Sequence, residues 1–434
     1  MADPTVRRNL LASRLSTDSR ARVLLWVVGA ALATVIAVWT IGHIVPPTMV
    51  WHEVNGQRLL DYRDTVVHTT HFWLSGGNPY DPDTFLKAYP WSQEFDPYAP
   101  LWLLLVAPLG LMPLPVGGAI FVVLLLAGEA WFAVRAAQWA WPRHHRVLAP
   151  ALYCWMMVWP PTRWVGASTL IILAIMGVLL SLRQSRETWW VAALAAVSCI
   201  KPQFGVPLLF FLLAYGRWRT VLRSVVVLLA GSAVPLLACI RSAGGLAGFV
   251  DSLRRDIAYA SSAKAPTGMG SQINFRTDVP GILGRLGAPE WPGAWQIAFA
   301  ATVLVAVALV LRRTNSPELA AVMISTGLLL LPVHADYDLA LLVASSSGAI
   351  AFLRLHGGRA ALALVVCTVL PVLHLHQVSM ALGPSLDAVE ALDVLCILVA
   401  LALGLWLGAT TNHQGESWQN SSSFTGVVPR RALL

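Results

Sequence analysis

The residues best suited to chemistry begin with an acidic motif, Asp61-Tyr62-Arg63-Asp64, about fifteen residues beyond the first apolar stretch. A carboxylate held beside a substrate hydroxyl can take its proton as a general base, although most loop carboxylates are simply solvated. Asp61 is the first candidate and Asp64 the second, because both lie at the start of an amphipathic helix expected over 61–75 and are almost one turn apart. The alternative is that Asp61 only caps this helix. Its expected apolar contacts are Val66, Val67, Phe72, Trp73 and Leu74.

The triplet Lys201-Pro202-Gln203 is the second candidate. The chain has only three lysines, and Lys201 stands between two apolar half-spans. An ionisable residue in such a place is costly and is functional by default. Its ammonium group would stabilise a phosphate that leaves in a transition state. The alternative is a lysine that snorkels from a helix end, but Pro202 favours a helix break over a simple end.

A dense polar turn, His334-Ala335-Asp336-Tyr337-Asp338, separates apolar stretches near 317–333 and 338–354. An ordinary polar turn between helices is the alternative. The motif lacks a standard metal-ligand spacing such as HExxH, so we predict no metal. Acid–base support from His334 and hydrogen bonding by its neighbours are the expected roles.

The segment Phe95-Asp96-Pro97-Tyr98-Ala99-Pro100 leads into an apolar stretch over 99–113 that three prolines interrupt. This pattern predicts a short helix that dips into the membrane without crossing it. Asp96 and Tyr98 would line a site at its start. Weaker candidates are Arg163, after Pro160-Pro161, and Gln272, Asn274 and Arg276, in a later loop.

Apolar stretches long enough to suggest membrane helices must position these groups, since about 20 apolar residues cross a bilayer. Several are shorter and would need tilt or partial insertion. The expected spans lie near 23–46, 115–136, 147–161, 166–183, 188–200, 204–216, 222–240, 292–311, 317–333, 338–354, 359–378 and 388–409.

Arginine clusters orient these spans, because cytoplasmic loops carry an excess of positive charge. The rule places residues 1–22 and the polar, disordered tail expected over 412–434 in the cytoplasm. The clusters between spans agree if 99–113 does not cross. Two long segments, about 47–98 and 241–291, then lie outside, together with the candidate residues.

The composition is also that of a membrane protein. The chain is 57% hydrophobic and 12% charged, too few charges for a soluble protein of 434 residues. The formal charge of +8 lies in arginines between apolar runs, which indicates topology and not nucleic-acid binding. Five cysteines without a CxxC pair suggest small core residues. We therefore expect an all-α, polytopic helical bundle of about twelve spans.

Taken in order, these motifs resemble glycosyltransferase family 87, a GT-C family that includes actinobacterial polyprenyl-phosphate-mannose α-mannosyltransferases and an arabinofuranosyltransferase. The resemblance covers about residues 23–410. Two departures are Ala99, where the family usually has proline, and Gly166-Ala167-Ser168-Thr169 in place of Gly-Gln-x-Asn. The matching motifs are Asp61, Gly77-Asn78-Pro79-Tyr80, Tyr98-Ala99-Pro100, Pro108-Leu109 to Pro113, Lys201-Pro202-Gln203 and His334 to Asp338.

The resemblance implies a GT-C transmembrane domain over 23–411 in the plasma membrane. It implies inverting transfer, without cofactor or metal, on the extracytoplasmic face. The donor would be a polyprenyl-phosphate sugar, with mannose the first expectation, and the acceptor a glycolipid or lipoglycan of the cell envelope. The expected sites are catalytic Asp61, Asp64 and His334; phosphate-binding Lys201, Gln203, Arg163 and Arg276; and sugar- or acceptor-binding Tyr62, Tyr80, Asp96, Tyr98, Asn274, Asp336, Tyr337 and Asp338.

Three other functions stay open from the sequence. An arabinofuranosyltransferase of the same family would share every motif. A lipid-linked polysaccharide polymerase or ligase would usually need a long late outer loop. A transporter would be expected to show repeats and a polar path across the whole membrane. In this chain the late turns are short, and the polar candidates gather on one side.

Overall fold

The computed structural model describes residues 62–90, 92, 98–157, 167–184, 186–260, 278–289, 291–332, 336–372 and 386–422. At positions 154, 155, 157, 167, 336, 337, 386–388 and 411–422 it describes the backbone alone. Every regular element in this described part is a helix, so the all-α prediction is confirmed there. The span expected over 23–46 lies outside the described residues.

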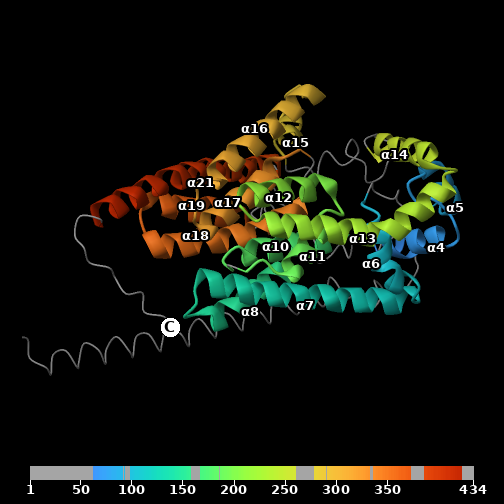
Figure 1. The fold of residues 1–434 in the computed structure, drawn as a ribbon, viewed down its shortest axis with the longest axis horizontal. Coiled ribbons are helices and arrows are strands. Elements are labelled where there is room, and N and C mark those ends of the chain that lie inside the picture. Colours follow the sequence, from blue (N-terminus) through green and yellow to red (C-terminus); the bar gives the residue numbers. More distant parts are fainter. Residues whose placement is uncertain are drawn as a thin grey trace, which may run out of the picture.

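Helices of different lengths run side by side along the long axis of the molecule, which is horizontal in Figure 1. In chain order they are η1 (Arg63–His68), α4 (Thr69–Leu74), α5 (Pro82–Ala88), α6 (Leu101–Gly110), α7 (Leu114–Ala140), α8 (His145–Met157), α10 (Ala167–Ser181), α11 (Trp189–Ser198), α12 (Pro202–Ala214), α13 (Trp218–Ser242), α14 (Leu246–Ala260), α15 (Val279–Arg285), α16 (Gly293–Leu311), α17 (Pro317–Leu330), η3 (Asp336–Leu341), α18 (Leu342–His356), α19 (Arg359–Val372) and α21 (Leu386–Ser422).

Within the described part, five segments are long and apolar enough to cross a membrane: α7, α13, α16, residues 338–356 and residues 389–410. The other predicted spans that can be compared form apolar helices of 10 to 17 residues. These are shorter than the roughly 20 residues of a full crossing. The structure is therefore a membrane helical protein, and the count of about twelve spans stays a prediction.

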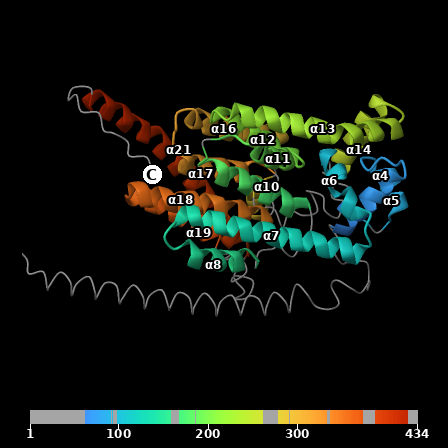
Figure 2. The same cartoon turned by 60° about the horizontal axis from the view of Figure 1, so that its bottom comes forward.

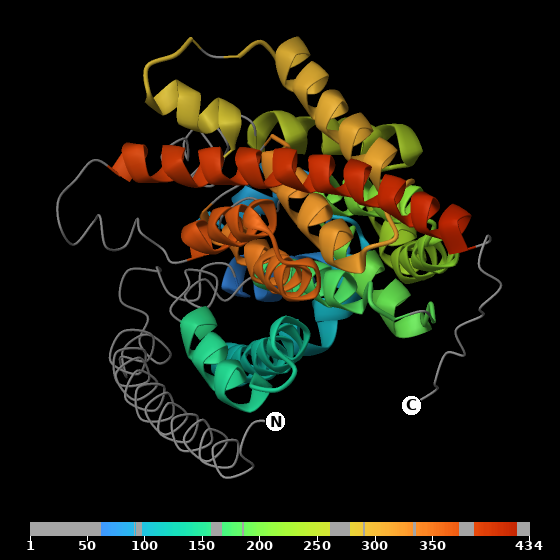
Figure 3. The same cartoon turned by 90° about the vertical axis from the view of Figure 1, so that its left-hand side faces the viewer.

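The centre of the bundle is formed by α17 and α18. Every residue of α17 from Glu318 to Leu330 is buried. A β-carbon added to Gly348 of α18 would lie 2.8 Å from the carbonyl oxygen of Glu318, so the absence of a side chain there lets the two helices approach. Figure 3, which looks along the bundle, shows α7 and α8 on one side of this pair and α21 on the other.

Two groups of turns lie at opposite ends of the bundle (Figure 2). At one end Arg217 donates to the carbonyl of Leu182, at 2.7 Å, and Arg223 donates to that of Glu187, at 2.6 Å. At the other end Ser242 donates to the carbonyl of Gly76, joining the two long predicted outer segments. Figure 2 shows α4, α5 and α14 gathered at that end.

The amphipathic helix expected over 61–75 is confirmed from Arg63 to Leu74, where η1 continues into α4. Val66 and Trp73 are buried, whereas Leu74 is exposed and makes no contact of the expected kind. The first turns form a π-helix, which has more residues per turn than an α-helix and so rotates the following side chains. This shift explains why a 3.6-residue period misplaces Leu74.

Two further expectations concern α6 and the tail. The ten residues of α6 rise about 15 Å, too little to cross, in agreement with the predicted dipping helix. Helix α21 continues to Ser422, into the stretch expected to be disordered, while 423–434 lie outside the described residues. Extending a formed helix adds one hydrogen bond per residue fixed, so polar residues can continue it.

Helices α11 and α12 form a hairpin that starts and ends at the same end of the bundle. Glu187, just before α11, accepts hydrogen bonds from the backbone and hydroxyl of Thr220, just after α12. With 10 and 13 residues the two helices rise roughly 15 and 20 Å, against a hydrocarbon core of about 30 Å. Ile200 and Lys201, at the tip of this hairpin, are both buried.

Gly205 permits this tight hairpin, and its replacement should destabilise it. A β-carbon at Gly205 would lie 2.2 Å from the α-carbon of Cys199. We expect Gly205→Ala to lower the thermal midpoint of the purified protein, since such overpacking costs about 1–3 kcal/mol. Gly293→Ala is the control, because nothing lies within 4 Å of an added carbon there. Equal midpoints for both variants would contradict the close approach.

Candidate active site

The start of α6 brings three of the sequence motifs together. The backbone N–H of Ala99 donates to the carbonyl of Ile200, at 2.8 Å, which places the residue before Lys201 against the residue after Tyr98. The hydroxyl of Tyr80 donates to the carbonyl of Tyr98, at 2.6 Å. The Gly-Asn-Pro-Tyr, Tyr-Ala-Pro and Lys-Pro-Gln motifs, which are far apart in the sequence, therefore meet in the structure.

Lys201 is buried, with only 7% of its surface exposed. Its ammonium group donates to the hydroxyl of Ser168, at 2.7 Å, and lies 5.9 Å from the centre of the Tyr98 ring. Both contacts suit a cation, since the face of an aromatic ring attracts positive charge. Lys201 thus points inward and does not snorkel to the surface.

The first turn of α12 adds to the positive character of this place. Lys201 precedes the helix and Pro202 occupies its first turn, where the missing N–H of proline costs nothing. The N-terminus of a helix carries about half a positive charge, so anions are stabilised beside it. Gln203 is exposed in the same turn. A lysine and a helix N-terminus together make this tip a suitable place for a phosphate.

Asp64 lies in a second polar cluster, on η1. Its carboxylate is 1% exposed and pairs with the Nε of Arg63, at 2.6 Å. The hydroxyl of Ser92 donates to the same carboxylate, at 3.1 Å, and Nδ1 of His68 lies 3.4 Å from it. His68 also contacts Ser92 and stacks on Tyr89, with ring centres 4.4 Å apart.

This arrangement can hold and move a proton. His68 is the more accessible member, with 25% of its side chain exposed, whereas the carboxylate of Asp64 is almost fully enclosed. A carboxylate beside a histidine fixes the orientation of the ring. Asp64 can therefore act on a substrate directly after a small opening, or through His68.

Packing connects the Asp64 cluster to the Lys201 tip. The indole N–H of Trp102, on α6, donates to the carbonyl of Thr65, at 2.8 Å. The rings of Trp102 and Tyr98 are in edge contact, 5.9 Å apart, and Tyr98 in turn contacts Lys201. Trp102 and Tyr98 thus connect the helix that carries Asp64 to the side chain of Lys201.

Tyr62 and Tyr80 are almost completely buried. Tyr62 donates to the carbonyl of Leu109, at 3.1 Å, and burial raises its pKa to about 12. The pKa of Tyr80 is raised well above its ordinary value by burial and, to a lesser extent, by Cys239 and Asp256. Both phenols therefore stay protonated and hold α6 in place; their hydroxyls serve the protein itself.

A further side of the site is formed by η3, which packs against α10. Asp338 is buried in η3, and Glu129 of α7 is buried nearby. Glu129 lines a cavity of about 20 Å³ with Thr169 of α10 and Ala340 of η3. That volume is enough for a water molecule.

Several predicted residues cannot be compared. Asp61, Asp96, Arg163, Asn274, Arg276 and His334 lie outside the described residues, and the side chains of Asp336 and Tyr337 do as well. Within the part that the structure describes, no group of three or more His, Cys, Asp or Glu side chains could hold a metal ion.

Sequence reasoning missed four side chains of this site: His68, Ser92, Glu129 and Ser168. His68 carried a signal, because it follows Asp64 by four residues in an expected helix and so shares its face. Glu129 also carried one, as a carboxylate inside a long apolar span. Ser92 and Ser168 meet their partners only through contacts between distant parts of the chain.

Comparison with known proteins places the chain in a family. The model of glycosyltransferase family 87 matches residues 97–333, just over half of the chain. This range includes Tyr98, Ser168 and Lys201, and begins after Asp64. No curated protein and no solved structure matches. The chain therefore belongs to glycosyltransferase family 87, a GT-C type family, and is a membrane-embedded glycosyltransferase.

Proposed function

We propose that the chain transfers a sugar, in the first place mannose, from a polyprenyl-phosphate donor to a glycolipid or lipoglycan acceptor. The observation that carries this proposal is the buried ammonium of Lys201 beside the N-terminus of α12. A charge inside an apolar bundle is costly unless it serves a function. The ammonium group can bind the phosphate of a lipid-linked donor while the polyprenyl chain of that donor stays in the bilayer.

The reaction needs one base and one group that accepts the leaving phosphate. The acceptor hydroxyl loses its proton to the base as its oxygen bonds to the anomeric carbon, on the face opposite the phosphate. The bond between the anomeric carbon and the phosphate oxygen breaks, and its electron pair leaves on the polyprenyl phosphate. Attack from the opposite face inverts the anomeric centre. The positive charge that develops on the sugar in such reactions favours nearby carboxylates.

The proposed roles are based on the Lys201 tip and the Asp64 cluster. Lys201 and the first turn of α12 would stabilise the charge that develops on the leaving phosphate. Asp64, alone or with His68, would accept the proton, and Asp61 remains its rival. Phosphate leaves without a strong acid, so one base is enough. We further propose no metal or other cofactor, about twelve spans, and a site on the extracytoplasmic face of the plasma membrane.

Reconstituted transfer tests the proposal. The purified protein in liposomes would be given radiolabelled polyprenyl-phosphate mannose and a panel of envelope glycolipids. We expect labelled glycolipid product from this donor, unchanged by EDTA. If only the corresponding arabinofuranose donor supports transfer, the donor sugar is arabinofuranose and not mannose, and the family assignment is unchanged. Transfer only from a nucleotide sugar, or no transfer from any lipid-linked donor, would contradict the proposed function.

A further inference from the structure

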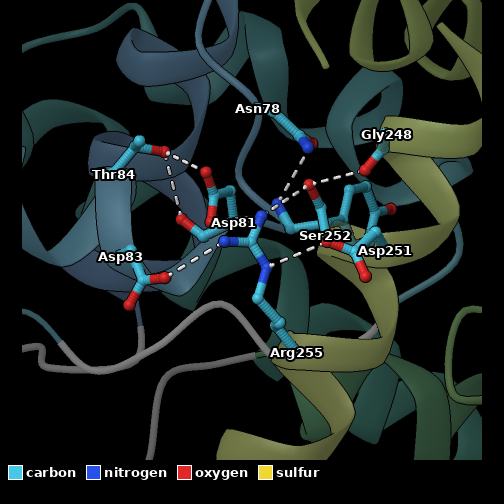
Figure 4. A network of polar contacts seen from close by, with 9 residues as sticks. Asn78, Asp81, Asp83, Thr84, Gly248, Asp251, Ser252 and Arg255 are labelled. Atoms are coloured by element: carbon cyan, nitrogen blue, oxygen red, sulfur yellow. Dashed lines mark hydrogen bonds and ion pairs between the residues drawn. The ribbon is translucent and has the colours of Figure 1, made fainter. Parts of the chain in front are cut away.

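A polar cavity lies where the two long outer segments meet, away from Lys201. Its volume is about 370 Å³, within the range of small-molecule sites. Phe72 and the turn before α5 form one wall, and the end of α13 with α14 forms the other. Figure 4 shows polar side chains from both walls turned toward each other. The roles assigned above to Lys201 and Asp64 do not use this cavity, which neither residue lines.

Arg255 of α14 organises the cavity. Its guanidinium lies 3.3 Å from the carboxylate of Asp81, 3.2 Å from that of Asp83 and 3.7 Å from that of Asp251. It also contacts the hydroxyl of Ser252, at 3.5 Å. Thr84 donates to Asp81 at 3.1 Å, so the carboxylate of Asp81 is held from two sides. The hydrogen-bonding groups are thus fixed before a ligand arrives.

Asn78 supplies an independent sign of a ligand. Only 5% of its surface is exposed, and it lines the cavity with its amide turned toward the other polar groups. Its side-chain oxygen accepts from the backbone N–H of Tyr80, at 3.3 Å. Its amide nitrogen has no hydrogen-bond partner among the described residues. A buried donor without a partner is costly, so an acceptor from a bound molecule would satisfy it.

The charges select the class of ligand. The guanidinium of Arg255 is shared among three carboxylates, which leaves the cavity with an excess of negative charge and disfavours a phosphate. The same guanidinium at the centre disfavours a metal cation. A neutral molecule with many hydroxyls fits best, since carboxylates accept from hydroxyls and amides and guanidinium donate to them. Phe72 offers an aromatic surface for the apolar face of a sugar ring.

The cavity also lies at a useful distance from the candidate base. Phe72 and Asp64 belong to the continuous helix of η1 and α4 and are eight residues apart, roughly 12 Å at 1.5 Å per residue. We propose that the cavity binds a sugar residue of a neutral saccharide acceptor, removed from the residue that is glycosylated. This inference rests on the proposed transferase function and deepens it: the enzyme would extend an existing saccharide.

Acceptor length tests the inference. We would compare synthetic glycolipids that share one lipid and carry either a single sugar or a longer neutral chain. Wild-type protein should show a lower KM for the longer acceptor. Asn78→Ala and Asp251→Asn should raise that KM about tenfold, the loss expected for one good hydrogen bond, and leave the KM of the donor unchanged. Transfer to the single-sugar acceptor should be equal in wild type and Asp251→Asn.

Asp83→Asn is the matched control. Asp83 and Asp251 are both largely exposed, at 76% and 68%, and both pair with Arg255, but Asp83 does not line the cavity. We expect Asp83→Asn to retain the wild-type preference for the longer acceptor. An equal loss of preference in both aspartate variants would overturn the inference, because it would assign the effect to the ion pairs.

A binding measurement separates this inference from the proposed function. Saturation-transfer NMR with the free oligosaccharide headgroup, without donor, should show equal affinity for wild type and Asp83→Asn and an affinity about tenfold lower for Asn78→Ala. This pattern would support the cavity even if no lipid-linked donor were accepted. Undiminished oligosaccharide binding by Asn78→Ala would overturn the inference, as would Mn²⁺ binding that is lost in Asp251→Asn.

Discussion

Lys201→Ala should reduce sugar transfer by about a hundredfold or more while the protein still folds. The reason is that a preorganised group facing developing negative charge typically contributes a few kcal/mol to lowering the barrier. The ammonium of Lys201 is buried and is held by Ser168 and Tyr98, so it is preorganised before the donor binds. Initial rates with saturating lipid-linked donor and acceptor, per amount of folded protein, measure the effect.

Two matched variants identify the cause. Lys201→Arg keeps the positive charge but is larger and branched, so we expect a partial loss, smaller than that of Lys201→Ala. Lys87→Ala removes an exposed lysine from α5 and should behave as wild type. Wild-type transfer by Lys201→Ala would reject the assignment. A thermal midpoint far below that of wild type would instead assign Lys201 to packing.

The position of Lys201 at a helix break could be predicted from the sequence, but the partners of its side chain could not. A lysine and a proline between two short apolar runs indicate a break inside the membrane, and the α11–α12 hairpin has that break at the expected place. The partners of Lys201 could not be read in the same way. Ser168 is 33 residues away, and the contact depends on how α10 packs beside the hairpin. Hydrophobic periodicity reports which face of a helix is buried, not which neighbour it meets.

Apolar length alone does not determine the number of crossings, for the same physical reason. Helices α10, α11, α12, α17 and α19 are apolar because protein or lipid surrounds them, yet each has fewer than 18 residues. Burial in the bundle and burial in a bilayer select the same residue types. The length of the helix separates the two, and helix boundaries are what sequence patterns determine least well.

Asp64→Asn should abolish most transfer, by about a hundredfold or more, if Asp64 is the base or acts with His68 as the base. Asparagine has nearly the same shape and still accepts from Ser92, but it cannot take a proton. The alternative is that Asp64 only balances the charge of Arg63, its partner at 2.6 Å. In that case the variant loses stability, because removing one member of a buried ion pair leaves the other uncompensated. Transfer per folded molecule would then stay near that of wild type.

Three further variants locate the base. Ser92→Ala removes the hydroxyl that donates to Asp64 and should cost less than Asp64→Asn, because the proton acceptor remains. His68→Asn should match Asp64→Asn if the two act as one unit, since removing either member of such a unit stops it. If Asp61→Asn is inactive while Asp64→Asn transfers normally, Asp61 is the base and Asp64 a structural residue. Normal transfer by both aspartate variants would contradict both assignments. The next candidates for the base would then be His334 and Asp336, which follow Lys201 in the sequence.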